Sequence, residues 1–248
     1  MRKSTILIGF VVILAVTFLG LQVFEQFYVS DLVRPFMLPL LTLAYVFRYK
    51  DTKSYFFLFL LFFSIAEILG GIIYFDPDNV VLDNFQYYTG NLCLISAYIF
   101  LILEIYKTIK LNVVLKKYPI HLLVLLALDI YCVVLVSRVS INSGFMVNNI
   151  ECIIEVIYNS CIMLLLTVSL LNYLHNDSNK SMSLLIASLC LLFSEVIQVA
   201  FYYVKYISLL EIVSSILLIT AFTIFFNQAR LKYSDVKKFK TLDKLEEA

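Results

Sequence analysis

The sequence predicts an all-α, polytopic membrane protein, built as a bundle of eight transmembrane helices with both termini in the cytoplasm. Of the 248 residues, 62% are hydrophobic and 15% are charged, and the mean hydropathy is +0.92. That is more apolar surface than a soluble domain of this length buries. The apolar runs reach about 20 residues, enough to cross a hydrocarbon core of about 30 Å as helix. Runs such as "YFFLFLLFFSIAEILGGIIYF" also lack the alternation that is typical of transmembrane β-strands.

Eight such runs follow one another along the chain. They cover residues 4–23, 31–47, 55–75, 84–106, 119–137, 149–173, 182–204 and 206–227. The first continues through "ILAVTFLGLQVF" without a small-x-small cleavage site, so we interpret it as a retained helix and not as a signal peptide. Because the connections are short, residues 1–228 are expected to form one transmembrane domain, and residues 229–248 a short basic cytoplasmic tail.

The basic residues orient the bundle, because Lys and Arg remain preferentially on the cytoplasmic side of a membrane. With the N-terminus inside, sixteen of the nineteen basic residues are cytoplasmic: Arg2, Lys3, Arg48, Lys50, Lys53, Lys107, Lys110, Lys116, Lys117, Lys180, Arg230, Lys232, Lys237, Lys238, Lys240 and Lys244. Arg138 and Lys205 fall outside, together with the acidic loop "FDPDNVVLDNF", and Arg34 alone lies within an apolar run. This distribution of basic residues is therefore consistent with an even number of helices and both termini inside. We expect a multi-pass protein of a bacterial plasma (inner) membrane.

Several functional classes have little support in the sequence. The net charge of +1 gives no reason to expect nucleic acid as a partner. Only two histidines are present, His121 and His175, too few for a membrane zinc hydrolase. No lysine lies in the middle of the last run, where a retinal protein would need one. The cysteines are single residues within the predicted helices, expected to serve packing: Cys93, Cys132, Cys152, Cys161 and Cys190. We expect neither metal nor cofactor.

The charged residues inside the apolar runs are the strongest functional signal. Each costs about 2.5–3.5 kcal/mol to insert at the centre of a membrane helix, so each is a hypothesis for a functional site. They are Arg34, Glu67, Glu104, Asp129, Glu151, Glu155, Glu195 and Glu211. The predicted helix directions place Glu67 and Glu195 just beyond mid-membrane on the outer side, and Arg34, Glu155 and Glu211 in the same outer half.

Two of these charges are open to a structural interpretation. Glu104 lies near the inner end of its helix, where we expect it to pair with Lys107 or Lys110. Asp129 falls at mid-membrane and is compatible with either a structural or a functional role. Neither residue is therefore placed among the candidate site residues.

Two runs resemble each other internally. Aligning "LFFSIAEILGGIIYF" with "LCLLFSEVIQVAFYY" superimposes Glu67 on Glu195 and Tyr74 on Tyr202. Seven residues separate each Glu from its Tyr, which is close to two helical turns, so each pair shares a face. The runs have the same direction and are four helices apart, as a parallel 4+4 duplication would require. Chance similarity between aromatic-rich helices is the alternative.

Two carboxylates that face one cavity can act together in proton transfer. Burial and mutual repulsion separate their proton affinities, so one can act as general acid and the other as base. Arg34 could neutralise one of them or hold an anionic headgroup. The structural alternative is that Arg34 pairs with a glutamate only to join helices.

Four segments resemble, in order and spacing, the YhhN family of eight-helix membrane proteins, which includes the animal lysoplasmalogenases. The segments are "LVRPFMLPLL", "FSIAEILGG", "GNLCLISAYIFLI" and "LLFSEVIQV". The family has Lys-Pro, Gly-Asp, Gly followed by Ala-His, and Ser-Asp at the corresponding places. The matching residues here are Arg34-Pro35, Ala66-Glu67, Gly90 followed by Ala97-Tyr98, and Ser194-Glu195. Each charge type is kept, and the histidine is replaced by tyrosine.

The resemblance implies hydrolysis of the vinyl-ether bond of a lysoplasmalogen, which yields a fatty aldehyde and a glycerophospho-base. The partner would be a membrane lipid or a single-chain lipid substrate entering from the bilayer. Glu67 and Glu195 are the candidate catalytic residues, their division into acid and base left open. The candidates for substrate binding are Arg34, Asn91, Tyr98 and Glu211.

Two other functions stay open at this stage. The chain could be a non-catalytic membrane module that binds or senses a lipid through the same polar cavity. It could also be a proton-coupled carrier, because carboxylates in a duplicated bundle suit proton relays. A carrier would have broken helices in corresponding halves, whereas only the run 31–47, with Pro35 and Pro39, looks interrupted.

Overall fold

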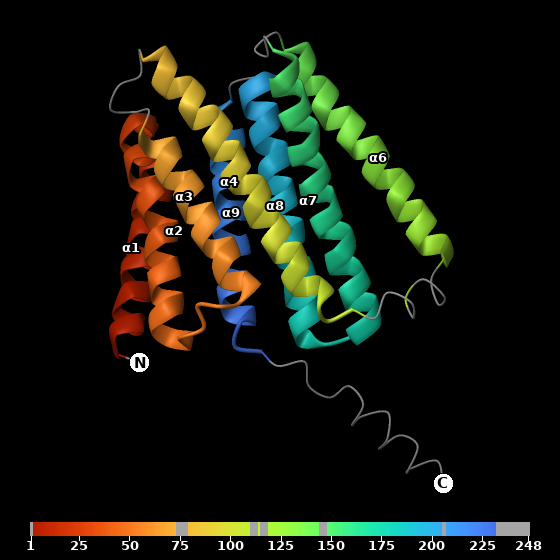
Figure 1. Cartoon of the computed structure of the whole chain (residues 1–248). Coiled ribbons are helices and arrows are strands. Elements are labelled where there is room, and N and C mark those ends of the chain that lie inside the picture. Colours follow the sequence, from red (N-terminus) through yellow and green to blue (C-terminus); the bar gives the residue numbers. More distant parts are fainter. Residues whose placement is uncertain are drawn as a thin grey trace.

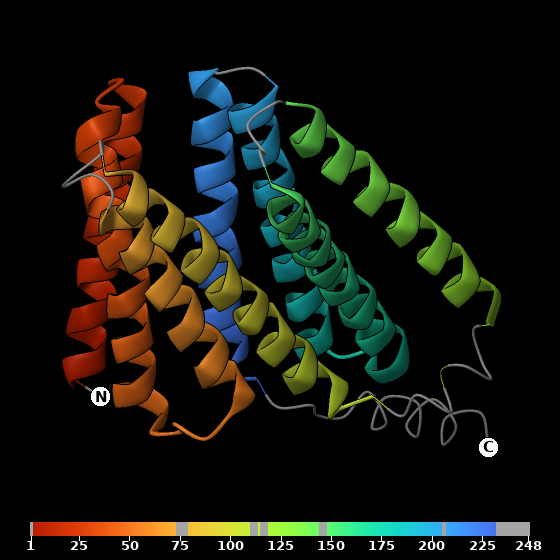
Figure 2. The ribbon, with the colours of Figure 1, turned by 45° about the horizontal axis from the view of Figure 1, so that its top comes forward.

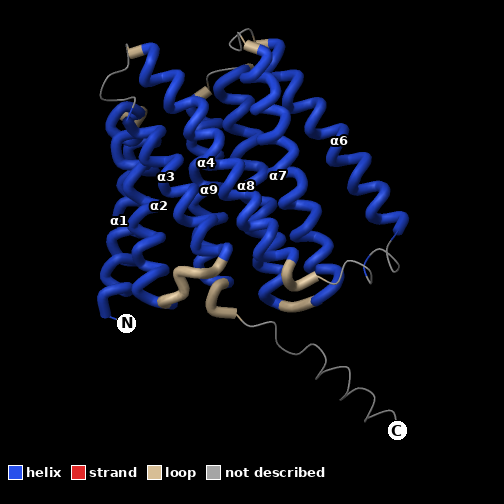
Figure 3. Tube along the Cα trace, in the orientation of Figure 1, coloured by secondary structure: helices blue, strands red, loops and turns tan. Residues whose placement is uncertain are grey.

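The computed structural model describes residues 2–72, 79–109, 114, 119–143, 148–204 and 207–231. This part of the chain is helical and contains no strand (Figures 1 and 3). Its eight long helices are all of the length and apolarity that cross a membrane. They are α1 (Arg2–Val23), α2 (Phe27–Tyr49), α3 (Tyr55–Ile72), α4 (Val80–Tyr106), α6 (Pro119–Asn142), α7 (Asn149–Asn176), α8 (Asn179–Tyr203) and α9 (Ser208–Gln228).

The eight predicted runs are confirmed within a few residues, and the differences lie mainly at polar helix ends. Helix α8 begins three residues before the apolar run because Ser178 caps it, its Oγ accepting a hydrogen bond from the Ser181 amide at 3.2 Å. Helix α4 begins early for the same reason, with Asn79 Oδ1 accepting from the Leu82 amide at 3.2 Å. Capping residues satisfy the free amides of a first turn and are polar, so an apolar-run criterion omits that turn.

Successive helices run in opposite directions, so the described chain begins and ends at the same end of the bundle (Figure 1). We call this the near end, and the opposite one the far end. Seven helices pack in a ring, in the order α1, α2, α3, α4, α7, α8, α9 and back to α1. Helix α6 lies outside this ring, against α7 and α8 (Figure 2). The ring leaves an interior that side chains from several helices can share.

Helix α2 is continuous from Phe27 to Tyr49, through Pro35 and Pro39. The expected interruption of this run is therefore wrong. Proline has a helical φ, and membrane helices tolerate the loss of its amide hydrogen bond. Gly71 of α3 packs directly on this segment, since a Cβ at position 71 would overlap the Pro35 ring. Proline and glycine together bring α2 and α3 into close contact beside Arg34.

An aromatic cluster fills the near half of the ring. Phe59 of α3 stacks on Phe222 of α9 with ring centroids 5.7 Å apart, and Phe63 meets the same ring edge-on at 4.8 Å. Phe225 adds an edge-on contact with Phe59 at 5.4 Å. All four rings are buried. The cluster closes the near half of the interior, and the polar residues gather above it, toward the far end.

Helix α6 has only 6% of its membrane window buried, and interhelical hydrogen bonds join it to α7. Asp129 is one of these contacts, and the structure gives it a helix-joining role. Interhelical hydrogen bonds of this kind stabilise membrane bundles by about 0.6 kcal/mol each on average. The side-chain hydrogen bonds are Thr167 Oγ1 to Asp129 Oδ2 (2.6 Å), Ser140 Oγ to Glu155 Oε1 (2.9 Å) and Asn159 Nδ2 to Ser137 Oγ (3.2 Å).

Candidate functional site

A polar cavity occupies the far half of the ring. Its larger part, about 530 Å³, lies between α2, α3, α4 and α8. A smaller part of about 190 Å³ also touches α7 and has Phe63, the last ring of the aromatic cluster, in its wall. The two parts share the residues Arg34, Glu67, Asn91, Leu94, Gln198 and Tyr202. We call them together the polar cavity.

Arg34 and Glu67 form an ion pair on the wall of the polar cavity. Arg34 Nε donates to Glu67 Oε2 at 3.0 Å, and Nη2 donates to Oε1 at 3.3 Å. This two-point pairing matches the planar guanidinium fork to the carboxylate and fixes the orientation of both groups. The side chains are 26% and 10% exposed. The pair joins α2 to α3, as the structural interpretation expected, and both residues line the cavity.

Glu195 is held differently, by two phenols. Tyr98 of α4 donates to Oε1 at 2.9 Å, and Tyr158 of α7 donates to Oε2 at 2.6 Å. The two hydroxyl oxygens are themselves 3.3 Å apart. A membrane-embedded carboxylate needs such donors, because a charge without partners is expensive there. Glu195 therefore sits at the centre of a three-residue hydrogen-bonded cluster contributed by three helices.

The sequence-predicted site residues are only partly brought together. Arg34, Glu67, Glu195 and Asn91 all line the smaller part of the polar cavity. Tyr98 is fully buried behind Glu195 and is not among the lining residues.

Glu211 is also absent from the walls of the polar cavity. Its Oε1 accepts a hydrogen bond from Gln22 Nε2 at 3.3 Å, which joins α9 to α1. Gln22 itself is 1% exposed. In the structure Glu211 thus makes a helix–helix contact and does not line the polar cavity.

Sequence reasoning missed Tyr158 and Gln198. Tyr158 lies one turn after Glu155, on a face of α7 that also carries Asn159. Polar groups three and four residues apart inside an apolar run share a helix face, and a buried phenol needs a partner. That pattern could have identified Tyr158. Gln198 lies three residues after Glu195 and one before Val199, and all three line the smaller part of the cavity.

Charge changes sign along the larger part of the cavity. Arg34 lies on the same lining as Asp31 of α2 and Asp83 of α4. Gln86 and Tyr87 also line it, and Gln86 Oε1 and the Tyr87 hydroxyl are buried without a hydrogen-bond partner among the described residues. Buried polar atoms are normally paired. Within the part of the chain that the structure describes, the larger part of the cavity thus carries one cation, Arg34, which is paired with Glu67, and two further carboxylates, Asp31 and Asp83.

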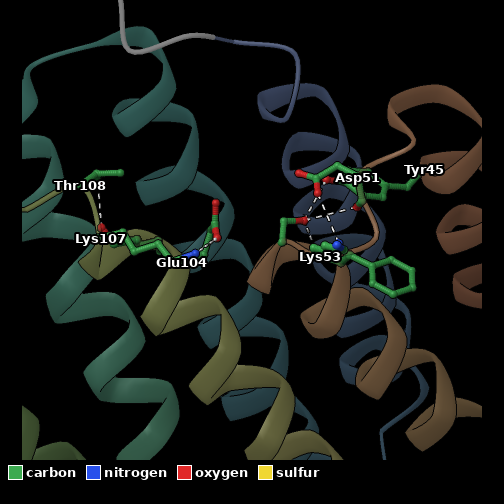
Figure 4. Close-up of polar contacts among 9 residues, drawn as sticks. Tyr45, Asp51, Lys53, Glu104, Lys107 and Thr108 are labelled. Atoms are coloured by element: carbon green, nitrogen blue, oxygen red, sulfur yellow. Dashed lines mark hydrogen bonds and ion pairs between the residues drawn. The ribbon is translucent and has the colours of Figure 1, made fainter.

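A second group of polar contacts lies at the near end and joins helix ends (Figure 4). Lys107 Nζ is 3.5 Å from Glu104 Oε2 and 3.8 Å from the centre of the Tyr55 ring. The expected pairing of Glu104 is confirmed with Lys107, while Lys110 lies outside the described residues. Tyr45 and Ser54 place their hydroxyls 3.4 Å apart across the α2–α3 turn. These contacts are separate from the polar cavity.

Within the described residues, no three or more His, Cys, Asp and Glu side chains are placed to hold a metal ion. A search for similar proteins found no matching family model, no matching curated protein and no matching solved structure.

Proposed function

We propose that this protein is an integral membrane enzyme that hydrolyses the vinyl-ether bond of a single-chain lipid of the lysoplasmalogen type. One observation carries the proposal: Glu67 and Glu195, two of the three glutamates among the described residues that line the smaller part of the cavity, have partners of different chemistry. The third, Glu155, accepts hydrogen bonds from Ser140 and Asn159. Glu67 is ion-paired with Arg34, and Glu195 is hydrogen-bonded to Tyr98 and Tyr158.

The reaction needs an acid and a base at one place. A vinyl ether, R–CH=CH–O–R′, accepts a proton on its β-carbon and becomes an oxocarbenium ion. Water then adds to the α-carbon and loses a proton, and the resulting hemiacetal separates into the aldehyde and the alcohol R′–OH. The proton given in the first step is recovered in the second, so only water is consumed. Positioned acids and bases accelerate such transfers by about 10²–10⁴-fold.

The different partners of the two carboxylates suggest a division of roles. Glu67 is engaged by a cation, which suits a group that remains ionised, faces the oxocarbenium ion and accepts the proton of the attacking water. Glu195 accepts hydrogen bonds from two neutral phenols, and these stabilise the carboxylate that remains once its proton has been given to the β-carbon. We assign Glu195 as the proton donor, with Tyr158, which also lines the cavity, as the group that positions it.

The larger part of the cavity complements the polar end of such a lipid. Arg34 offers positive charge toward a phosphate, and Asp31 and Asp83 offer negative charge toward an ammonium group. Asn91 lies on the same wall, its amide nitrogen donating to the Tyr87 carbonyl at 2.8 Å. Opposite charges on one lining favour a zwitterionic phospho-base over a simple anion.

The resemblance to the YhhN family adds support at Tyr98, the position of the family histidine. The Tyr98 hydroxyl donates to Glu195, a contact that an imidazole N–H could also make. A non-catalytic lipid-binding module uses the same cavity and is the alternative that the experiment below separates. A proton-coupled carrier is not favoured, because the eight described helices are continuous, α2 with its prolines included.

We further propose that the near end faces the cytoplasm of a bacterium and that the protein resides in the plasma membrane. The distribution of Lys and Arg supports this orientation. The internal resemblance of α3 to α8 supports a 4+4 duplication of the bundle. Tyr74, the counterpart of Tyr202 in that alignment, lies outside the described residues.

The proposal is tested by aldehyde release from lysoplasmenyl-ethanolamine by the purified protein. We expect Glu67→Gln and Glu195→Gln each to lower the rate by about 100-fold or more, because each removes a proton-transfer group. Glu104→Gln, at the near end and outside the cavity, is the matched control and is expected to keep the wild-type rate.

Two results would contradict the proposal. One is a rate that neither cavity substitution changes. The other is saturable lipid binding by wild-type protein without hydrolysis of vinyl-ether or ester lipids, which would identify a binding module.

A further inference from the structure

An apolar groove lies beside the ion pair, between α1, α2 and α9. It has a volume of about 60 Å³, and its wall includes Val11 and Ala15 of α1, Leu38 of α2, and Leu218 and Phe222 of α9. Its surface is almost entirely apolar apart from Arg34, Glu67 and Thr223. Helix α1, which forms one wall, is itself only 11% buried over its membrane window. On this side, α1 is the single helix between the groove and the outer surface of the bundle.

The groove and the polar cavity both border the Arg34–Glu67 ion pair. Arg34 and Glu67 line both of them, so the ion pair marks the boundary between an apolar and a polar compartment. Along α2 the groove extends from Arg34 to Leu41. At 1.5 Å per residue, this distance is about 10 Å toward the near end.

We propose that this groove binds the first part of the hydrocarbon chain of a single-chain lipid whose polar end occupies the polar cavity. The inference rests on the proposed function and adds the position of the chain. In a vinyl-ether lipid the bond to be broken lies where the apolar chain joins the polar glycerol. The ion pair borders the two matching compartments, so a lipid bound across it presents that bond to Glu67.

The position of the groove directly across the ion pair from the polar cavity is what identifies the occupant. A separate apolar ligand would have no use for the two charged residues in the wall, whereas an amphiphile needs both surfaces side by side. The groove is about 10 Å long by the helical rise, so it holds only the carbons next to the ether. The remainder of the chain extends past α1 into the bilayer.

The test uses a non-hydrolysable alkyl-ether lysophospholipid that carries a diazirine on the chain within a few carbons of the ether. Full-length protein in nanodiscs is photolysed with this probe, and the modified residues are mapped by mass spectrometry. We expect modification of α1, α2 and α9 at groove residues. Modification confined to α6, α7 or other lipid-facing surfaces would overturn the inference.

Bulky substitutions at a groove residue and at an exposed residue near it on the same helix provide the matched comparison. Ala15→Phe fills the groove, and Val16→Phe adds an aromatic ring at the neighbouring position, which is 66% exposed. We expect Ala15→Phe to lower groove modification several-fold and Val16→Phe to leave it unchanged. Leu218→Phe, with the exposed Ile216→Phe as its control, repeats the comparison on α9 should Ala15→Phe fail to fold. Equal modification in both members of each pair would overturn the inference.

The probe cannot be hydrolysed, so its result is independent of turnover. Aldehyde release together with modification outside the groove would leave the proposed function standing and contradict the chain position. Modification inside the groove without aldehyde release from a vinyl-ether substrate would keep the groove as a lipid site and contradict the enzymatic function.

Discussion

At the scale of single residues, the site depends on two glutamates whose side chains have different partners. Glu67 meets a cation at 3.0 Å, while Glu195 meets hydroxyls at 2.9 and 2.6 Å. The same side-chain type can carry different roles when its partners differ. In the sequence both follow the pattern of a glutamate inside an apolar helix, and this pattern does not predict which partner each one meets.

The shortest contact of Glu195 gives a prediction at this scale. Tyr158→Phe removes the hydroxyl that donates to Oε2 at 2.6 Å, while the ring and its packing remain. Hydrogen bonds to charged groups contribute about 1.5–3 kcal/mol, so we expect aldehyde release to fall by about 10- to 100-fold.

The control for this change is Tyr88→Phe. Tyr88 also donates to a carboxylate, Glu151 Oε1 at 3.3 Å, but neither residue lines the polar cavity. We expect Tyr88→Phe to retain the wild-type rate. Equal losses in the two variants would mean that the Tyr158 hydroxyl supports the fold and not the positioning of Glu195.

At the scale of helices, the contact between α2 and α3 determines whether the ion pair forms. Gly71 lies against Pro35, the residue after Arg34, and its lack of a side chain permits that approach. Hydropathy identifies both helices as membrane spans but is insensitive to which glycine is at the contact. The neighbouring Gly70 meets only Gln86 Nε2, at an ordinary 4.0 Å.

Gly71→Ala should therefore separate α2 from α3 and weaken the Arg34–Glu67 pair. Overpacking of this kind costs about 1–3 kcal/mol. We expect a lower unfolding temperature in detergent and a loss of aldehyde release. Gly70→Ala serves as the matched control for stability and is expected to keep the wild-type unfolding temperature. Equal unfolding temperatures of the two variants would contradict the close contact at Pro35.

Helix α6 shows that hydropathy predicts a membrane helix but does not predict which helices it packs against. Its sequence is as apolar as that of the ring helices, with a mean hydropathy of 2.4 over its membrane window. It nevertheless lies outside the ring, and hydrogen bonds of Asp129 and Glu155 join it to α7. Apolar composition reports that a helix can cross a membrane. It does not report whether its neighbours are helices or lipid.

At the scale of the whole molecule, the even number of described helices places both ends of the described chain on one side. The near end carries the α2–α3 turn with Lys53, and the far end carries the start of α4 with Asn84. Both residues are exposed. They are therefore suitable positions for testing which end faces the cytoplasm.

We expect Asn84→Cys to react with a membrane-impermeant maleimide on intact cells, and Lys53→Cys to react only after lysis. The physical reason is the retention of basic segments on the cytoplasmic side. Wild-type protein is the control, because its five cysteines all lie within helices. The reverse pattern of labelling would invert the proposed topology.

The sequence by itself determined the all-helical class, the eight spans and the residues that are costly to place in a membrane. These properties follow from hydropathy and charge, which act locally along one helix against lipid. Only the tertiary structure decided that Arg34 meets Glu67, that Tyr158 meets Glu195, and that Glu211 meets Gln22 and does not line the polar cavity. It also placed the ion pair between a polar cavity and an apolar groove. Such pairings depend on which helices become neighbours in the ring and how they are rotated, and those are long-range properties that no single helix encodes.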